Sequence, residues 1–596
     1  MTYRAPVAEI LLSMIHEAGM DPERKPSIYA ELGDGFAEAT LKEAAKYAES
    51  VLAPLNSVGD REGAKLDSGR VTVPPGFANA YRKWAAGGWN AISGPQDYGG
   101  AGLPVLLNTA CIEIWSAANV SFSLCPLLTF AAIEAMESHA SKALKELYLA
   151  KLISGAWTGT MNLTEPQAGS DLGGLKMRAE RQGDGSYKLF GSKIFITYGE
   201  HDMAENIIHF VLARLPDAPK GTRGISLFLV PKMVVNDGGN LGKRNDVFCA
   251  SLEHKLGIHA APTCTMVYGD HGGAMGFLVG EENKGLACMF AMMNNARLNV
   301  GVQGVAIAER AFQQALGYAG ERRQGRAPGE RGEGMSPIIR HPDVMRMLLT
   351  MKSLTSAARA ICFATAASID RSRRAQDDAE HGAAFERASL LTPVAKAFST
   401  DIANEVASLG VQVHGGMGYI EETGAAQYLR DARIAAIYEG TNGIQAIDLV
   451  QRKLGLSQGE TMRREIASMR EVTRALRENA ENFGEMESHL SDAVDSLERA
   501  TLFMQEAGAA RPEEALAGAA PYLRLFAVAL GGTLLAKGAL AARRLSTAGN
   551  NDPLLPAKIA CARFFAENIA AGAGGLAREV MLGGGSVLAG SSALER

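Results

Sequence analysis

The hydrophobic pattern of the chain changes twice along its length, and these changes limit the folds that it can adopt. Up to about residue 157, apolar residues recur every three or four positions, as in Ala39–Asn56, which is typical of amphipathic helices. Between Thr158 and Asp270 the pattern becomes a series of short β-branched and aromatic runs separated by turn sequences, which indicates strands. The helical period returns from Gly285 onward.

We therefore predict an α+β multidomain fold. The middle block predicts an antiparallel β-barrel or sandwich, and the nearly apolar segment 521–545 predicts a helix that is buried on most sides. The expected domains are an N-terminal helical domain (1–157), a middle β domain (158–275), a helical bundle (276–456) and an additional C-terminal helical domain (457–596).

Composition and charge exclude several classes of protein. The 596 residues are too many for one hydrophobic core, and the formal net charge of −5 gives no basic surface for a nucleic acid. The seven cysteines form no CxxC pair, which favours a reducing cytosol over a disulfide framework. The first 20 residues contain Glu9 and Glu17, so they predict an amphipathic helix instead of a signal peptide. The uncharged stretch 114–133 contains Asn119 and Pro126, and it favours a buried core over a membrane insertion.

Common phosphate and metal motifs give little support to other functions. The chain has no GxxxxGK[ST] and no HExxH sequence, and its eleven histidines are dispersed, so we expect no metal site. One GxGxxA sequence occurs at Gly572–Ala577, but it lies in an alanine-rich helical block with no strand before it. Close helix packing on small residues explains it better than a dinucleotide-binding loop.

Two stretches of the β block could bind a planar ligand. The segment Met161–Glu180 contains glycines and hydroxyls that could approach a heterocycle or a diphosphate, although an ordinary polar turn explains the composition at least as well. Phe195 and Thr197 lie two positions apart on a predicted strand, so they should share one face. They could line a cofactor or belong to the core.

One carboxylate, Glu439, lies within the otherwise apolar stretch Ile434–Val450. An acid at such a loop either marks the start of a helix or has a chemical role. Thr441 is the better N-cap for the helix that follows, which leaves Glu439 available for chemistry. Gly440 has no side chain and would allow a ligand to lie close to the backbone.

Two longer sequences, taken together, resemble the acyl-CoA dehydrogenase family of flavoproteins. Leu163–Gly174, LTEPQAGSDLGG, is similar to the first family signature, and Val411–Gln445, VQVHGGMGYIEETGAAQYLRDARIAAIYEGTNGIQ, is similar to the second. The resemblance covers about residues 40–455. The initial helix and the C-terminal block resemble a subgroup of the family whose chains are similar in length to these 596 residues. This subgroup includes 3-methylmercaptopropionyl-CoA dehydrogenases.

The resemblance implies an enzyme that removes hydrogens from the α and β carbons of an acyl-CoA thioester. Glu439 is then the base that takes the α proton, and the β hydrogen leaves as hydride to N5 of FAD. The implied FAD contacts are Met161, Leu163, Thr164, Gly169, Ser170, Phe195, Ile196, Thr197, Arg322, Gln324, Gln412, Gly415, Gly416, Thr441 and Gly443. The implied acyl-CoA contacts are Ser170, Asn294, Arg297, Tyr438 and Gly440. Asn294, Gly325, Gly443 and Met161 depart from the commoner residues of the family, whereas the base does not.

The resemblance also implies the partners of the protein. We expect a cytoplasmic homo-oligomer, a dimer, in which Arg322 serves the FAD of the neighbouring subunit, and an electron-transfer flavoprotein that accepts the electrons. The expected substrate is 3-methylmercaptopropionyl-CoA or a short- to medium-chain acyl-CoA. Two alternatives stay open: an acyl-CoA oxidase that passes electrons to oxygen, and a catalytically silent relative that associates with DNA.

Overall fold

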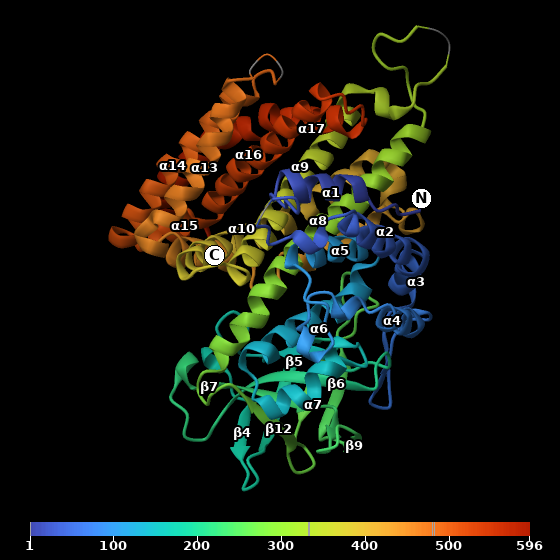
Figure 1. Cartoon of the computed structure of the whole chain (residues 1–596), viewed down its shortest axis with the longest axis vertical. Helices are drawn as coiled ribbons and strands as arrows, with labels where there is room; N and C mark the ends of the chain where they lie inside the picture. Colours follow the sequence, from blue (N-terminus) through green and yellow to red (C-terminus); the bar gives the residue numbers. More distant parts are fainter. Residues whose placement is uncertain (1, 25, 332–333, 480, 482, 596) are drawn as a thin grey trace. The chain divides into compact units, whose positions relative to one another are not determined.

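The structure, a computed structural model, describes residues 2–24, 26–331, 334–479, 481 and 483–595 (Figure 1). Residues 332 and 333, in the predicted connector 326–337, lie outside the described residues. The chain forms two compact units, and each draws on separate stretches of the sequence. The first unit contains Met1–Ala45, Val105–Ala117 and Arg297–Arg596, and the second contains Lys46–Pro104 and Ala118–Ala296.

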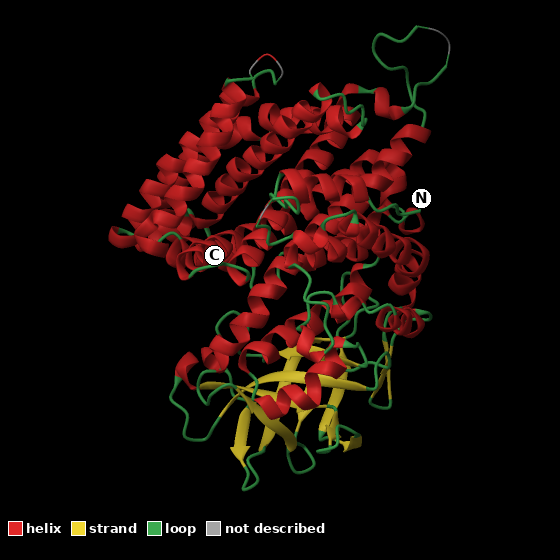
Figure 2. Cartoon of the chain, viewed as in Figure 1, coloured by secondary structure: helices red, strands yellow, loops and turns green. Residues whose placement is uncertain are grey.

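The predicted order of helical, β and helical regions along the chain is confirmed. Figure 2 distinguishes the helices from the strands. The helices are α1 (Val7–His16), α2 (Phe36–Tyr47), α3 (Ala53–Glu62), α4 (Phe77–Ala86), α5 (Val105–Ala118), α6 (Val120–His139), α7 (Lys142–Ile153), α8 (Gly285–Glu321), α9 (Pro342–Arg373), α10 (Asp378–His414), α11 (Ala425–Ala435), α12 (Asn442–Asp448), α13 (Glu460–Arg477), α14 (Met486–Ala510), α15 (Pro512–Ala517), α16 (Ala519–Thr547), α17 (Leu554–Asn568), α18 (Ala573–Leu582) and α19 (Gly584–Ala589). The strands are β1 (Lys65–Asp67), β2 (Arg70–Thr72), β3 (Trp157–Asn162), β4 (Arg178–Arg181), β5 (Tyr187–Thr197), β6 (Asn206–Arg214), β7 (Ile225–Pro231), β8 (Met233–Val235), β9 (Leu241–Arg244), β10 (Val247–Leu252), β11 (Thr263–Tyr268) and β12 (Ala274–Val279).

The main sheet of the second unit has eight strands in the order β10-β11-β5-β12-β7-β6-β3, with β4 pairing with β5 and β6. Most pairs are antiparallel, as predicted, but β3 runs parallel to β6 and β4 meets β6 in a parallel pair. The two parallel pairs are therefore the departure from the antiparallel arrangement that was predicted. Parallel neighbours need a long crossover connection, and the segment that contains β4 and β5 supplies it between β3 and β6.

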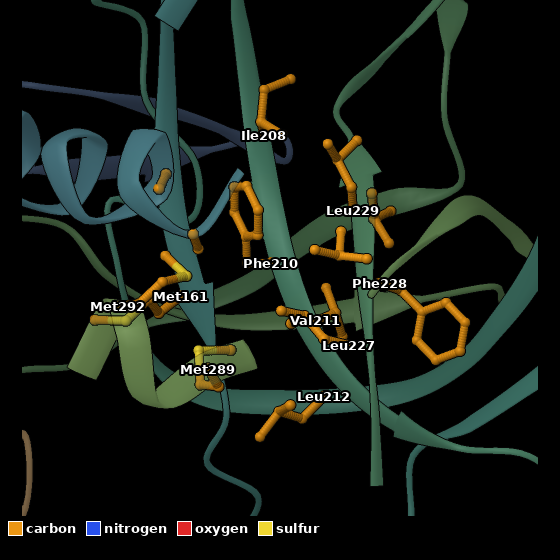
Figure 3. Close-up of a cluster of buried hydrophobic side chains, with 14 of the residues drawn as sticks. Met161, Ile208, Phe210, Val211, Leu212, Leu227, Phe228, Leu229, Met289 and Met292 are labelled. Atoms are coloured by element: carbon orange, nitrogen blue, oxygen red, sulfur yellow. The ribbon is translucent and has the colours of Figure 1, made fainter. Parts of the chain in front are cut away.

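The core of the second unit lies on β6 and β7, whose residues are buried on both faces except at Arg214 (Figure 3). Methionines from β3 and α8 complete the cluster with Phe210, Val211 and Leu229. Helix α6 covers β3 closely, because a Cβ placed on Gly159 would lie 2.4 Å from the Cβ of Ala132. Glycine is therefore required at this contact between helix and strand.

Buried ion pairs connect the separate stretches of the first unit. Arg359 on α9 donates to Glu113 on α5 at 2.6 and 2.8 Å and to Glu309 on α8 at 2.9 Å. Asp370 on α9 accepts hydrogen bonds from the N–H groups of Val105 and Leu106 at the start of α5. These contacts explain why residues 105–117 belong to a unit that otherwise begins at Arg297.

Among the described residues, two helices, α6 and α16, are long and apolar enough to cross a membrane by length and composition. In each, 89% of the apolar window is buried within the fold, as in a core helix. Helix α16 contains the segment predicted to be buried on most sides, and it packs against α9 and α17.

Candidate functional site

Glu439 lies in the short turn between α11 and α12 of the first unit, and its backbone has the left-handed conformation (φ 55°). Gly440 follows with φ 85°. A residue other than glycine pays about 1–2 kcal/mol for this conformation, and such outliers occur often at functional sites. Thr441 is the N-cap of α12, since its hydroxyl accepts a hydrogen bond from the N–H of Ile444 at 3.2 Å. The predicted cap is confirmed.

Gln445 fixes this turn from the inside of α12. Its side-chain amide donates to the carbonyl oxygens of Glu439 and Gly440 at 3.2 and 3.3 Å. A Cβ on Gly440 would lie only 2.9 Å from the same amide nitrogen. Gly440 is thus required by its conformation and by crowding, before any ligand is considered.

Lys396 on α10 also holds this turn through hydrogen bonds. Its ammonium donates to the carbonyl oxygen of Gly440 and to the side-chain oxygen of Asn442, both at 2.9 Å, and the lysine is completely buried. Asn442 in turn donates to Asp401 on α10 at 2.6 Å. Lys396 is not among the residues predicted from the sequence, although a lone cation inside the apolar run TPVAKAF is the signal that could have revealed it.

Arg297 on α8 lies on another side of the turn. Its Nη1 is 3.5 Å from Oδ2 of Asp448, and its Nη2 lies 3.9 Å from the position that a Cβ on Gly440 would occupy. The structure therefore brings the predicted substrate residue Arg297 to the backbone that follows the predicted base. Asp448 also pairs with Arg452 at 3.3 Å.

The charges around the turn act on one another. Burial raises the pKa of the Glu439 carboxyl, and the positive charges of Arg297 and Lys396 oppose this rise. Burial lowers the pKa of Lys396 to about 7, against the opposing effect of Glu439 and Asp401. Burial also raises the pKa of the Tyr438 hydroxyl, and the Glu439 charge adds to the effect.

Three buried polar atoms near the turn have no hydrogen-bond partner among the described residues. They are Nε of Arg297, Nε2 of Gln303 and Oε1 of Gln445. The hydroxyl of the predicted substrate residue Tyr438 donates to the other side-chain atom of Gln303, its oxygen. Native structures leave few buried polar atoms unpaired, so these three atoms are suited to bind a polar ligand beside Glu439.

A second group of predicted site residues lies in the second unit, on the loop after β3. Glu165 and Lys193 form a buried ion pair at 2.8 Å beneath this loop. Glu165 also accepts hydrogen bonds from the N–H groups of Lys176 and Met177, and Lys193 donates to the carbonyl of Leu163. The pair thus orders the loop that carries Leu163, Thr164, Gly169 and Ser170, while Met161 lies on β3 just before it.

Phe195 occupies an unusual position at the end of β5. Its φ is 59°, and 57% of its surface is exposed. The β5–β11 pairing shifts register beside it, between the pairs of Lys193 and Ile196. The simple alternation predicted for Phe195 and Thr197 is therefore interrupted by a bulge. Ile196 is buried, and Thr197 is half-buried.

The remaining predicted residues lie at the surface. Arg322 and Gln324 follow α8 in the first unit, Gln412, Gly415 and Gly416 lie at the end of α10, and Asn294 lies on α8 within the second unit. All six are exposed. Gly443 lies in the first turn of α12, and the nearest atom to a Cβ placed on it is the Thr441 hydroxyl at 3.7 Å.

A GxSxG sequence, typical of serine hydrolases, occurs at Gly455–Gly459. It joins the end of α12 to α13 instead of following a strand, and Ser457 donates to Glu386 at 2.7 Å. Without the strand–turn–helix context it does not indicate a nucleophile.

Four family models match consecutive parts of the chain. They are the acyl-CoA dehydrogenase N-terminal domain (37–156), the middle domain (160–271), the C-terminal domain (283–454) and the acetyl-CoA dehydrogenase C-terminal like domain (462–590).

Individual proteins agree with these matches. The chain is 46% identical to a 3-methylmercaptopropionyl-CoA dehydrogenase of Ruegeria pomeroyi, over 96% of both chains. It is 35% identical to a butyryl-CoA dehydrogenase of Syntrophomonas wolfei, over 88% of both chains. The fold resembles that of an acyl-CoA dehydrogenase from Bacillus anthracis solved with FAD, with a TM-score of 0.71 and 20% identity over 95% of this chain and 92% of the other.

Proposed function

The chain belongs to the acyl-CoA dehydrogenase family, and we propose that it oxidises the bond between the α and β carbons of an acyl-CoA thioester with Glu439 as the base. The observation that carries the assignment of the base is the turn at Glu439. It presents a carboxyl with a raised pKa in a strained backbone, beside Arg297 and three unpaired polar atoms. Perturbed carboxyls of this kind are candidates for general bases.

The cofactor that we propose is FAD. The described residues of the second unit fit a flavin dinucleotide, because Phe195 offers a largely exposed aromatic ring and a Cβ on Gly169 would meet no atom within 4 Å. A glycine at such an open position allows a ligand to approach the backbone. The remaining residues proposed to hold FAD are Met161, Leu163, Thr164, Ser170, Ile196, Thr197, Arg322, Gln324, Gln412, Gly415, Gly416, Thr441 and Gly443.

The residues of the turn would carry out the proton chemistry. The ionised carboxylate of Glu439 takes the α proton, and the electron pair of that C–H bond becomes the second bond between the α and β carbons. FAD, when bound, supplies the acceptor for the hydride that leaves the β carbon. The raised pKa makes the Glu439 carboxylate a stronger base than a solvated one.

The substitution Glu439→Gln tests the base directly. We expect the variant to retain FAD and to bind acyl-CoA, while anaerobic flavin reduction falls by about three or more orders of magnitude, the scale seen when one member of a catalytic unit is removed. Stopped-flow absorbance of the flavin gives the rate. Glu422→Gln is the matched control, because Glu422 is an exposed carboxylate in the same signature stretch. Near-normal reduction in Glu439→Gln would exclude Glu439 as the base.

For the substrate we propose 3-methylmercaptopropionyl-CoA, with short- to medium-chain acyl-CoAs as the second choice. The identity to the Ruegeria enzyme supports the first, and the similarity to the butyryl-CoA dehydrogenase supports the second. Anaerobic titration of the yellow protein with a panel of acyl-CoAs, followed by kcat/KM for each, distinguishes them. Markedly faster turnover of long chains would contradict both.

Electron-transfer flavoprotein is the electron acceptor that the family resemblance supports. We expect the reduced enzyme to pass electrons to such a protein and to react slowly with oxygen. Rapid release of peroxide under air would instead identify an acyl-CoA oxidase.

A further inference from the structure

Lys396 is the only ammonium group that contacts the turn of Glu439 in the described part of the chain. Both of its hydrogen-bond acceptors are uncharged oxygens, the Gly440 carbonyl and the Asn442 amide. Asn442 is in turn bound to α10 through Thr400 at 3.0 Å and Asp401 at 2.6 Å. The Lys396 ammonium and the Asn442 side-chain amide therefore connect the turn to α10 by hydrogen bonds.

Burying an ammonium costs free energy unless nearby groups compensate for the lost water. Uncharged carbonyl oxygens satisfy donors without neutralising the charge. Arg297 differs from Lys396 in this respect, because Asp448 faces it directly. The charge of Lys396 is therefore less completely neutralised by a direct partner, and it acts on the nearby carboxylates of Glu439 and Asp401.

We propose that Lys396 is a positioning residue for Glu439: its ammonium holds the Gly440 carbonyl, and with it the left-handed turn, while its positive charge favours the ionised carboxylate. This inference rests on the proposed role of Glu439 as the base. It adds a second function to a lysine whose position on α10 would otherwise be explained by packing alone. The charge can be tested apart from the exact hydrogen-bond geometry, because arginine keeps the charge with a different donor geometry, whereas methionine removes both the charge and the donors.

Several other charged groups surround Glu439 and Lys396 and also influence the electrostatics of the turn. Arg297 from α8 acts on Glu439, Lys396 and Asp448, and Arg452 acts on Arg297. Asp401 is influenced by Arg524 of α16 and by Glu405. Tyr438 is influenced by Asp431 of α11. Within this set, only Arg297 and Lys396 act directly on Glu439 as cations.

The pH dependence of flavin reduction separates the two effects. The acid limb is the pH range in which the rate of flavin reduction rises as Glu439 ionises. In Lys396→Met the loss of the positive charge should shift this limb to higher pH by about one unit, the lower end of the effect of a nearby opposite charge. The loss should be greatest below pH 7, because the pKa of Lys396 is about 7 and the lysine itself loses its charge above that value. In Lys396→Arg the guanidinium stays charged, so the acid limb should lie at or below its original pH, even if the maximum rate falls.

The experiment uses the holoenzyme, reduced anaerobically by butyryl-CoA and by 3-methylmercaptopropionyl-CoA between pH 5.5 and 9. Lys352→Met is the control, because Lys352 is a largely buried lysine that pairs with Glu9 and does not act on Glu439. A lower rate in both Lys396 variants at every pH, with no movement of the limb, would overturn the inference. An upward shift in Lys396→Arg would overturn it too, even if Lys396→Met does not fold.

Glu439→Gln, measured in the same series, separates this inference from the proposed function. If that variant reduces its flavin normally, the proposed base and the inference both fail. If it is inactive and the limb of Lys396→Met does not move, the base stands and only the role of Lys396 is wrong.

Discussion

The carboxyl of Glu439 experiences two opposing influences, dense surroundings that favour its neutral form and two cations that favour its charge. The net effect is a raised pKa. This balance depends on residues from α8 and α10, which are distant from Glu439 in the sequence. The sequence signature therefore predicted the base and its cap, whereas the contact of Lys396 with the turn became visible only when the helices were packed together.

We expect the unmodified enzyme to show an acid limb in flavin reduction. A base must be ionised, so the rate rises as pH rises through the pKa of Glu439. Because that pKa is raised, the limb should lie above pH ~4.3, the value of an exposed glutamic acid. Stopped-flow reduction across pH 5–9 measures it, provided that the protein keeps its FAD at each pH. A rate that is constant from pH 5 upward would contradict the raised pKa.

At the scale of elements, a buried ion pair anchors both ends of the loop between β3 and β4. Glu165 anchors the backbone at Lys176 and Met177, while Lys193 on β5 reaches the Leu163 carbonyl. Burial raises the pKa of Glu165, but the Lys193 charge and these hydrogen bonds outweigh burial and lower the pKa overall. Sequence patterns marked the loop as a ligand site or a polar turn, and they could not identify its anchor, because Lys193 lies on a different strand.

We expect Lys193→Met to destabilise the second unit by about 3–5 kcal/mol, since it leaves a buried carboxylate without its cation. FAD content should fall as the loop loses its anchor. Urea unfolding and flavin absorbance measure the two effects. The double variant Lys193→Met/Glu165→Gln removes both charges and keeps an oxygen that can accept from the loop N–H groups, so it should recover part of the lost stability. A double variant as unstable as the single one would argue against an effect of the unpaired charge.

At the scale of the whole molecule, the change from helix to strand at Trp157 and back to helix at Gly285 followed from local periodicity. The parallel pairing of β3 with β6 did not, because it joins residues about 50 positions apart, such as Trp157 and Asn206. The division into two interleaved units was likewise beyond local patterns. Residues 105–117 belong to the first unit through contacts such as Arg359 with Glu113, which no short stretch of sequence contains.

The predicted dimer can be tested at the exposed Arg322. If Arg322 serves the FAD of a neighbouring subunit, Arg322→Ala should lower FAD retention while the purified chain stays folded and dimeric. Size-exclusion chromatography with light scattering and flavin absorbance reports both properties. The exposed Arg543 on α16 provides a control, Arg543→Ala, for the general loss of a surface cation. A monomer with full FAD occupancy would contradict the predicted arrangement.

The left-handed backbone of Glu439 implies a compromise between stability and activity. Aspartate adopts this conformation more readily than most residues, so Glu439→Asp should relax the turn. The same exchange withdraws the carboxyl by one methylene, a displacement large enough to lower the rate of proton transfer severely. We therefore expect Glu439→Asp to melt at the same or a higher temperature than the original enzyme while it reduces its flavin much more slowly. At this position, the length of the glutamate side chain therefore matters more for activity than the strain of its backbone does for stability.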